Sequence, residues 1–337
     1  MATLKEVAKH AGVSITTVSR VMNDSSKVNP ETLQRVRRAM QELGYQPNRV
    51  AQRLRTTSGQ SKLLGLIIPD IQNQFYSSIV RGIEDVAYDK NYAVILCNSD
   101  EDPGKEKFYL DVLQSESVDG IILPPIHQHG KVVKELIKSG MPVVCVDRKL
   151  SRERVDTVVI NNEKGGYMAV EHLLSLGHRR IAILTSSPQF SSFEERQRGY
   201  EQALRDHGLE IDEKLIREGD PRSSEHARQL ANELLELERA PSAIFATNNL
   251  MTLGLLEAVN ENGLQIPDDI SVIGFDDMPW ARAVTPPLTV IRQPGYEMGR
   301  RAAELMFQRI ADPRREQVQI MMEPGIVLRE STSRWVK

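Results

Sequence analysis

TLKEVAKHAGVSITTVSRVMN, residues 3–23, contains the start and stop signals of two short helices joined by a tight turn. Thr3 and Glu6 have the spacing of a capping box, which marks the first turn of a helix. Gly12 is expected to end that helix, because glycine takes a positive φ without strain. Ser14 is a preferred N-cap residue and is expected to start the second helix. Apolar residues recur at helical spacing in both segments, as Leu4, Val7, Ala8 and Ala11 and then as Val18, Val21 and Met22.

A third helix is predicted after these two. It begins at Asn29 with Pro30 in its first turn and stops at Gly44, because proline suits the start of a helix and glycine its end. Its inward face carries Leu33, Val36, Met40 and Leu43. Two short helices joined by a glycine-containing turn, followed by a longer helix, predict a helix-turn-helix domain.

The outward face of the second helix is rich in small hydroxyl side chains. It carries Ile15, Thr16, Ser19 and Arg20. Short side chains let a helix enter the major groove of DNA. Arginine can bond bidentately to a guanine edge, threonine can bond a base or touch a thymine methyl, and serine can reach a phosphate. The pattern therefore predicts a helix that reads DNA.

The net charge of −3 hides an uneven distribution. Residues 1–62 contain 11 Lys+Arg and 4 Asp+Glu, whereas the remainder contains 32 Lys+Arg and 42 Asp+Glu. A small basic segment on an acidic body is expected to meet a polyanion. A solvated basic tail would have the same charge, but the helical spacing of its apolar residues favours a folded domain.

The length of 337 residues is typical of two or three domains, and 40% hydrophobic residues is typical of a soluble globular protein. No stretch approaches about 18 consecutive apolar residues, so no membrane span is predicted. The start of the chain carries charges where a secretory signal needs an apolar run. The two cysteines, Cys97 and Cys145, are interpreted as buried thiols of a cytoplasmic protein rather than as a disulfide or a metal site.

From Leu63 onward the pattern changes to alternating strands and helices. Apolar runs such as KLLGLIIPD, YAVILCNSD, VDGIILPP and PVVCVDR predict buried strands, and amphipathic segments between them predict helices. A second series follows, from TVVIN to ISVIGFDD, and the stretch from LTVIRQP to IVLRE is expected to cross back between lobes. The fold class is therefore α/β, with two doubly wound lobes that bind a ligand at the carboxyl ends of their strands.

Polar and aromatic side chains follow the predicted strands at those carboxyl ends. Aromatic rings cover the C–H face of a sugar, and charged and amide groups bond its hydroxyls. Single residues have structural alternatives, since Phe75 could be core and Asp147 or Asp276 could cap a helix. Together, at successive strand ends, they predict a monosaccharide site made of Asn73, Phe75, Tyr76, Asp147, Arg148, Asn161, Arg196, Asn248, Asp276 and Gln293.

TLKEVAKHAGVSITTVSRVMN, followed by GYQPNRVAQRLRT, resembles the N-terminal signature of the LacI/GalR family of bacterial transcription regulators. The resemblance continues through the body and implies a type-I periplasmic-binding-protein fold there. It also implies that the residues after the serine cap, here Ile15, Thr16 and Arg20, are the specificity positions. The whole DNA-binding set is then Ser14, Ile15, Thr16, Thr17, Ser19, Arg20, Asn23, Tyr45, Asn48, Ala51, Leu54 and Arg55.

QPNRVAQRLRTTSG, residues 46–59, is the second DNA element that the resemblance implies. It is expected to form a hinge helix only on the operator, with Leu54 wedged into a central minor-groove step and kinking the duplex. So short a helix is marginal alone. From the residues alone, an ordinary linker helix is the alternative.

The predicted organisation has three parts. A helix-turn-helix domain covers residues 1–46, the hinge and linker cover 47–62, and an effector-binding and dimerisation domain covers 63–337. The N-lobe is expected over about 63–161 and 291–320, and the C-lobe over about 162–290 and 321–335. The resemblance also implies a homodimer, and the terminal LRESTSRWVK lacks the Leu heptads that make some relatives tetrameric.

The body also resembles ribose-binding proteins. The Asn, the two aromatics, the Asp-Arg pair and the remaining polar residues of their pocket match the predicted monosaccharide site. One further aromatic of that pocket corresponds to Pro221 in this chain, which favours a sugar of different size or an epimer. Many relatives also have Asp where this chain has Asn249.

An enzyme is one alternative class. The chain contains neither GxGxxG nor a Walker loop at its first strand, and neither GxSxG nor HExxH. HQH at residues 127–129 lacks an evident third metal ligand, and FDD at 275–277 is explained by sugar binding. No catalysis, cofactor or metal is therefore expected. A transport-type sugar-binding protein is the other alternative, but the basic N-terminal domain argues against it.

The predicted function is sequence-specific repression of sugar catabolism genes, with release from a pseudo-palindromic operator by ribose or a similar monosaccharide. The expected partners are double-stranded operator DNA, the sugar and a second copy of the chain, without a membrane. A corepressor-dependent regulator that responds to a purine or to a phosphocarrier protein is the alternative.

Overall fold

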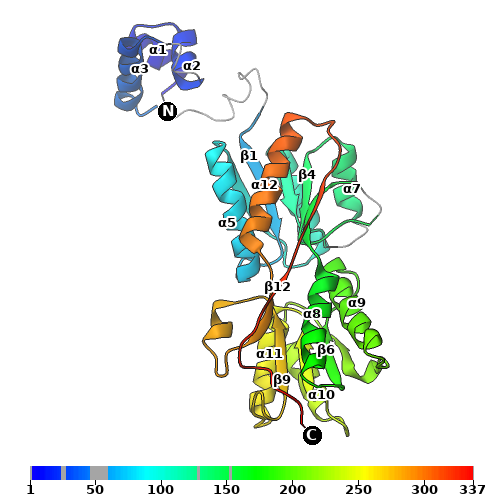
Figure 1. Cartoon of the computed structure of the whole chain (residues 1–337). Coiled ribbons are helices and arrows are strands. Elements are labelled where there is room, and N and C mark those ends of the chain that lie inside the picture. Colours follow the sequence, from blue (N-terminus) through cyan, green and yellow to red (C-terminus); the bar gives the residue numbers. More distant parts are fainter. Residues whose placement is uncertain (1, 24–27, 46–59, 127–129, 152–153, 337) are drawn as a thin grey trace. The chain divides into compact units, whose positions relative to one another are not determined.

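The computed structural model describes residues 2–23, 28–45, 60–126, 130–151 and 154–336. The chain forms two compact units, Met1–Ser61 and Lys62–Lys337. Figure 1 shows the ribbon coloured along the chain. Within the described ranges, no helix is long and apolar enough to cross a membrane.

The first unit contains the three predicted helices, α1 (Leu4–Ala11), α2 (Ile15–Asn23) and α3 (Pro30–Glu42). The predicted capping box is confirmed, because the Thr3 hydroxyl accepts from the Glu6 N–H and the Glu6 carboxylate accepts from the Thr3 N–H. Gly12 ends α1 with φ 66°. One fully buried valine from each helix stands in the core: Val7, Val18 and Val36.

The second unit contains two six-stranded sheets, which define an N-lobe and a C-lobe (Figure 1). The N-lobe sheet has the order β11 (Gln319–Met322), β5 (Asp156–Ile160), β4 (Val143–Val146), β3 (Gly120–Leu123), β1 (Leu63–Ile68) and β2 (Ala93–Asn98). The C-lobe sheet has the order β12 (Gly325–Val327), β10 (Thr289–Arg292), β9 (Ser271–Phe275), β8 (Ala243–Ala246), β6 (Ile181–Thr185) and β7 (Ile216–Glu218). Neighbours are parallel except β10 and β12, so the predicted doubly wound order is present twice.

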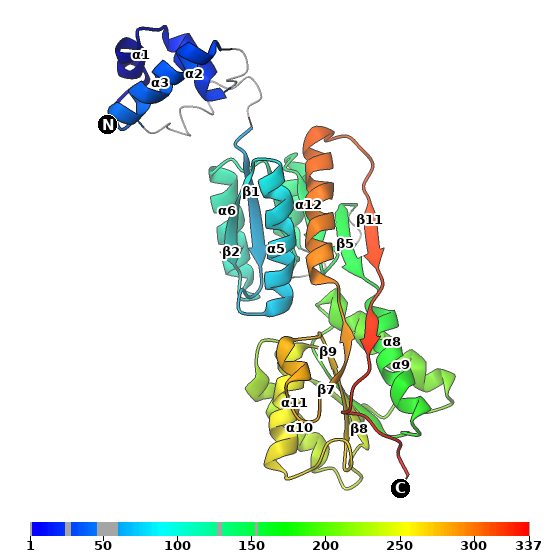
Figure 2. The ribbon, with the colours of Figure 1, turned by 60° about the vertical axis from the view of Figure 1, so that its left-hand side comes forward.

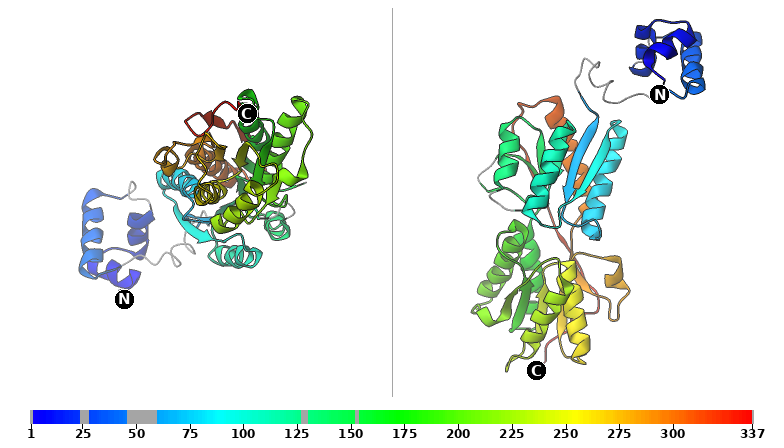
Figure 3. Two further views of the ribbon diagram at one scale, coloured as in Figure 1. Left: turned by 90° about the horizontal axis from the view of Figure 1, so that it is seen from below. Right: turned by 180° about the vertical axis from the view of Figure 1, so that it is seen from behind.

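Helices cover both faces of each sheet (Figures 2 and 3). In the N-lobe, α5 (Gln74–Asp89) and α12 (Gly295–Ala311) cover one face, and α6 (Pro103–Ser115) and α7 (Lys131–Lys138) the other. In the C-lobe, α8 (Asn162–Ser175) and α9 (Ser191–Asp206) cover one face, and α10 (Ser224–Leu235) and α11 (Asn249–Glu261) the other. Short 3₁₀ helices span Glu213–Leu215 and Pro279–Arg282. Because both faces are covered, the central strands are continuous apolar runs.

The chain passes between the lobes three times (Figure 1). β5 is followed by α8, β10 by α12, and β11 by β12. The sequence does not predict β7 and β11, which are short edge strands without a fully buried residue. Cys97 and Cys145 are buried free thiols, as predicted.

Glycine allows the helices on one face of each lobe to pack closely. A Cβ on Gly82 of α5 would lie 2.1 Å from the backbone oxygen of Tyr296 in α12. A Cβ on Gly199 of α9 would lie 2.0 Å from the backbone oxygen of Glu163 in α8. Backbone atoms cannot rotate out of the way, so both helix pairs depend on glycine at the crossing.

We expect Gly199→Ala to lower the free energy of unfolding by about 1–3 kcal/mol, because its methyl group forces α8 and α9 apart. Gly325→Ala is the matched control, since a Cβ at that position meets no atom within 4 Å. Urea unfolding measures both variants. Equal destabilisation by the two substitutions would contradict the close crossing.

Candidate functional site

The exposed face of α2 carries the residues that are predicted to read DNA. Val18 is fully buried, whereas Ile15 has 46% of its surface exposed. Ser14, Thr16 and Arg20 are exposed as well. Among the described residues Ile15 is not part of the three-helix core, and the exposed surface of α2 is the one that a major groove would receive.

Hydroxyl groups also hold the start of α2. The Thr17 N–H donates to Ser14 Oγ at 3.1 Å, and the two hydroxyl oxygens are 2.9 Å apart. Ser14 and Thr17 therefore have a capping role in addition to the predicted DNA contact. Ser19 and Tyr45 are half-buried, and Tyr45 packs against the three-helix core.

The remaining members of the predicted DNA-binding set lie at the end of α2 or beyond the three-helix domain. Asn23 is the last residue of α2. The HQH motif at residues 127–129 lies outside the described residues, and so do four members of the DNA-binding set: Asn48, Ala51, Leu54 and Arg55. In the part of the chain that is described, no group of three or more His, Cys, Asp or Glu side chains could hold a metal ion.

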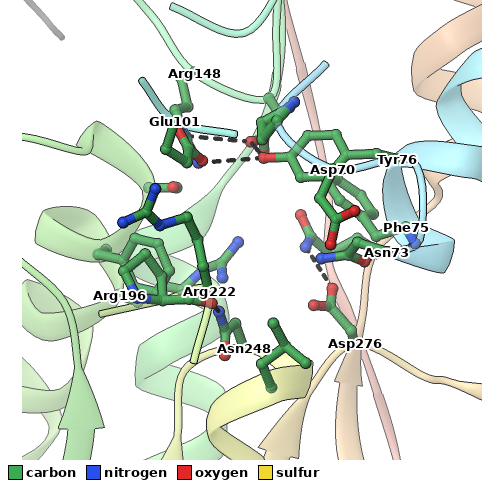
Figure 4. Close-up of a pocket in the computed structure, with 17 residues that line it drawn as sticks. Asp70, Asn73, Phe75, Tyr76, Glu101, Arg148, Arg196, Arg222, Asn248 and Asp276 are labelled. Atoms are coloured by element: carbon green, nitrogen blue, oxygen red, sulfur yellow. Dashed lines mark hydrogen bonds and ion pairs between the residues drawn. The ribbon is translucent and has the colours of Figure 1, made fainter. Parts of the chain in front are cut away.

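A second candidate site lies between the two lobes at the carboxyl ends of their strands (Figure 4). It is a cavity of about 50 Å³, room for about four water molecules or one small polar molecule. The N-lobe lines it with Pro69, Asp70, Asn73, Phe75, Tyr76, Glu101, Asp147 and Arg148. The C-lobe and the crossing segment contribute Ser192, Phe193, Arg196, Pro221, Arg222, Asn248, Leu250, Asp276 and Gln293.

All of the predicted effector residues except Asn161 line this cavity. Asn161, the remaining member of the predicted set, caps α8, and its Oδ1 accepts from the Lys164 N–H at 3.0 Å. The next residue, Asn162, is directed toward the site instead. Its Oδ1 accepts from Arg196 Nε at 2.8 Å, so it positions an arginine that lines the cavity.

Two aspartates approach the cavity from opposite lobes. Asp147 follows β4 with φ 67°, and Asp276 follows β9 with φ 78°. This left-handed backbone is uncommon for any residue other than glycine and is often found at functional sites. Tyr76 OH donates to Asp147 at 2.8 Å, and Gln293 Nε2 donates to Asp276 at 2.6 Å.

Both carboxyl groups are titratable groups in a low-dielectric site. Burial raises the pKa of Asp147, and the guanidinium groups of Arg148 and Arg196 oppose that shift. Burial likewise raises the pKa of Asp276, with Arg196 opposing it. Perturbed groups that converge in a cleft are characteristic of functional sites.

The guanidinium of Arg196 interacts electrostatically with both aspartates. Its Nη1 donates to the backbone oxygen of Thr247 at 2.6 Å, and its guanidinium lies 3.7 Å from the centre of the Phe275 ring. Burial lowers the pKa of Arg196, while the carboxylates of Asp276 and Asp147 act in the opposite direction. The arginine is therefore fixed in orientation before any ligand enters.

Two buried polar atoms at the cavity lack a hydrogen-bond partner among the described residues: Gln293 Oε1 and Arg148 Nε. A buried polar atom without a partner is costly. Arg148 Nε faces the Asp147 carboxylate at 3.5 Å, and both atoms are enclosed by neighbouring side chains.

The two lobes also contact each other directly across the cleft. Asn249 Nδ2 donates to Asn73 Oδ1 at 3.0 Å, and Asn73 Nδ2 donates to Asn249 Oδ1 at 3.4 Å. Lys149 of the N-lobe forms an ion pair with Glu195 of α9, and its N–H donates to Ser191 Oγ at 3.3 Å. The lobes are therefore held together by polar groups in addition to any ligand.

The prediction from sequence missed seven residues that also line the cavity: Pro69, Asp70, Glu101, Ser192, Phe193, Arg222 and Leu250. Asp70 is the last residue of the first strand run, KLLGLIIPD, and Arg222 is next to Pro221. These two had a signal in the same strand-end pattern. Glu101 has no comparable signal, because it lies in an acidic turn beyond the end of β2.

Comparison with known proteins matches both parts of the chain. Residues 3–48 match bacterial regulatory proteins of the lacI family, and residues 170–332 match a periplasmic binding protein-like domain. The HTH-type transcriptional regulator DegA of Bacillus subtilis is 36% identical over 334 residues, covering 98% of each chain.

Solved structures share the fold. The Lac repressor dimer bound to operator and the anti-inducer ONPF superposes with a TM-score of 0.87 at 30% identity, over 98% of this chain and 99% of that one. A LacI family transcriptional regulator from Enterococcus faecium with bound ribose superposes with a TM-score of 0.74 at 33% identity, over 81% of this chain and 100% of that one.

The amide pair between Asn73 and Asn249 can be tested with a double-mutant cycle. We expect a coupling energy of about 0.5–1.5 kcal/mol between Asn73→Ala and Asn249→Ala in the ligand-free protein, because each amide loses its partner in either single variant. Asn73→Ala alone costs more, since Asn73 also caps α5. Urea unfolding of the four proteins measures the coupling. Strictly additive losses would show that the lobes do not meet at this pair.

Proposed function

The chain belongs to the LacI family of bacterial regulatory proteins, and we propose that this DNA-binding transcriptional regulator is a repressor released from its operator by a ribose-like monosaccharide. The observation that carries the proposal is the convergence of Asp147, Asp276 and Arg196 on one small cavity. Charged groups that face each other across a cleft can bond successive hydroxyls of one sugar ring. The genes of sugar catabolism are the expected targets.

Aromatic and amide groups complete the chemistry that a sugar needs. Phe75 and Tyr76 lie edge to face with ring centres 5.2 Å apart. Both side chains line the cavity (Figure 4). Asn248 Nδ2 donates to the backbone oxygen of Pro221 at 2.8 Å, so its amide is already oriented. The ribose in the Enterococcus faecium relative supports the same ligand class.

A purine is the alternative effector. A flat bicyclic ring needs a broad apolar slot, whereas the lining of this cavity includes four carboxylates and three guanidinium groups. The polarity of the lining favours a monosaccharide. Binding requires no bond to be made or broken, so we propose no enzymatic activity and no cofactor.

The proposed switch couples the cavity to DNA. In a homodimer, each first unit inserts α2 into one half-site of the operator, so that the two copies read a pseudo-palindrome. Ile15, Thr16 and Arg20 face the base edges, and Leu54 of the hinge segment enters the minor groove between them. A sugar that bonds both lobes shifts the equilibrium only by its differential affinity for the two lobe arrangements.

The effector proposal predicts binding of D-ribose or a close epimer. At about 100 times its dissociation constant, such a sugar should stabilise the protein by about 2.7 kcal/mol and weaken operator binding. Asp276→Asn should abolish the shift, because it replaces one buried acceptor oxygen with a donor and removes the negative charge. Asp277→Asn is the control, since Asp277 pairs with Arg329 at 2.6 Å and does not line the cavity. Thermal melting and operator titration measure both effects.

Each contrary result has a distinct meaning. Tighter operator binding with the sugar would reverse the sign of the switch and indicate a corepressor. A shift with a purine base but with no pentose or hexose would replace the effector class. A response confined to a phosphocarrier protein would move regulation away from the cavity, while leaving the DNA-binding function intact.

The DNA-reading surface generates a separate prediction. Arg20→Ala should weaken binding to the cognate operator by about 1–3 kcal/mol and relax preference at one base pair. Arg37→Ala removes the same charge from an exposed position on α3 and should leave base preference unchanged. Binding to a set of single-base operator variants distinguishes the two. Retained base preference in Arg20→Ala would exclude Arg20 from readout.

A further inference from the structure

Glu101 occupies both arms of an arginine in the cavity. Arg148 Nη1 donates to Glu101 Oε2 at 2.8 Å, and Arg148 Nη2 donates to Glu101 Oε1 at 2.6 Å. The side chains of the two residues are only 4% and 6% exposed. Two parallel bonds of this kind are the geometry in which arginine binds the carboxylate or phosphate of a ligand. Glu101 thus stands where an anionic group of a ligand would bind.

The guanidinium of Arg148 is well prepared as an anion site. The Phe190 ring lies 4.6 Å from its central carbon, and Tyr76 OH accepts from Nη2 at 3.2 Å. Asp147 Oδ2 lies 3.5 Å from Arg148 Nε. These groups orient the guanidinium toward the side where Glu101 meets it, as Figure 4 shows for Arg148, Glu101 and Tyr76.

The chain holds Glu101 in place with an unusual backbone. Asp100 and Glu101 both have positive φ, 52° and 55°, and two successive non-glycine residues in this region are uncommon. Lys105 pairs with the Asp100 carboxylate, and Arg222 of the C-lobe donates to the Asp100 backbone oxygen. Backbone strain persists only where its surroundings impose it, so the inward position of Glu101 is determined from both lobes.

With Glu101, the cavity is lined by more carboxylates than guanidinium groups, which disfavours the binding of an anion. Its lining includes the carboxylates of Asp70, Glu101, Asp147 and Asp276 and the guanidinium groups of Arg148, Arg196 and Arg222. Arg222 is itself paired bidentately with Asp220, at 2.9 Å for each bond. An incoming anion therefore meets an excess of negative charge in a site with little water to screen it.

We propose that Glu101 is a specificity-determining residue that fills the anion-binding arms of Arg148 and restricts the effector to uncharged molecules, so that sugar acids and sugar phosphates are excluded. This inference rests on the proposed function for the sugar class. The carboxylate site on Arg148 is a property of the chain itself and can be tested without any sugar.

The first experiment restores a carboxylate to a variant that lacks one. Glu101→Ala leaves Arg148 buried without its partner, so we expect its melting temperature to fall. Sodium formate should raise the melting temperature of Glu101→Ala more than sodium chloride at equal ionic strength does. In the wild type, and in Glu257→Ala with its exposed carboxylate on α11 removed, the two salts should act alike. An equal response of Glu101→Ala to both salts overturns the anion site.

The second experiment measures selectivity. Calorimetric titration compares D-ribose, D-ribonate and D-ribose 5-phosphate in the wild type, in Glu101→Gln and in the charge-matched control Glu257→Gln. We expect the wild type to prefer ribose over its anions by at least about tenfold, and Glu101→Gln to reduce that preference while Glu257→Gln keeps it. The same preference in Glu101→Gln and the wild type overturns the proposal.

The two experiments separate this inference from the proposed function. If neither the wild type nor Glu101→Gln binds ribose or its anions, the monosaccharide proposal fails. In that case the formate experiment decides alone, because rescue supports the filled anion site on Arg148 and its absence overturns it. Glu101→Gln keeps the shape of the side chain, so selectivity can be measured even if Glu101→Ala does not fold.

Discussion

Charged groups buried between the two lobes set the conditions for the rest of the second unit. Asp147, Arg196 and Asp276 are all at most 6% exposed, and a buried charge is costly unless other charges and hydrogen bonds compensate it. The doubly wound fold supplies that compensation, because parallel strands bring their carboxyl ends to one edge in each lobe. The two edges face each other, so each charge finds partners from the opposite lobe or from the adjacent strand.

The same polar groups connect ligand binding to the arrangement of the lobes. Asn73 and Asn249 bond each other across the cleft, and Lys149 bonds α9 through both its backbone and its side chain. An effector that bonds both lobes shifts their equilibrium only by the difference between its own bonds in the two arrangements. Asn249 and Lys149 bridge the lobes without lining the cavity, so substitutions there are expected to change the response without removing a contact to the effector.

Much of this molecule could be predicted from its residues. The capping box at Thr3 and Glu6, the glycine stop at Gly12 and the buried strand runs are local signals, and local signals survive folding. The strand-end rule located most of the residues around the cavity, because parallel topology alone brings such positions together. The edge strands β7 and β11 were not predictable, since their short sequences have partners only through the completed sheets.

The remaining differences come from backbone conformation, which a residue type constrains only weakly. Asn161 and Asn162 both follow β5, and the sequence does not show which of them caps α8 and which points inward to hold Arg196. Asp147 and Asp276 point into the cavity from left-handed backbone, a conformation that aspartate tolerates. Glutamate adopts this conformation less often, so the sequence of the acidic turn does not predict that the Glu101 side chain lines the cavity. Strand order thus predicts which positions surround the cavity, whereas the backbone of the turns determines whether carboxylates such as Glu101 point into it.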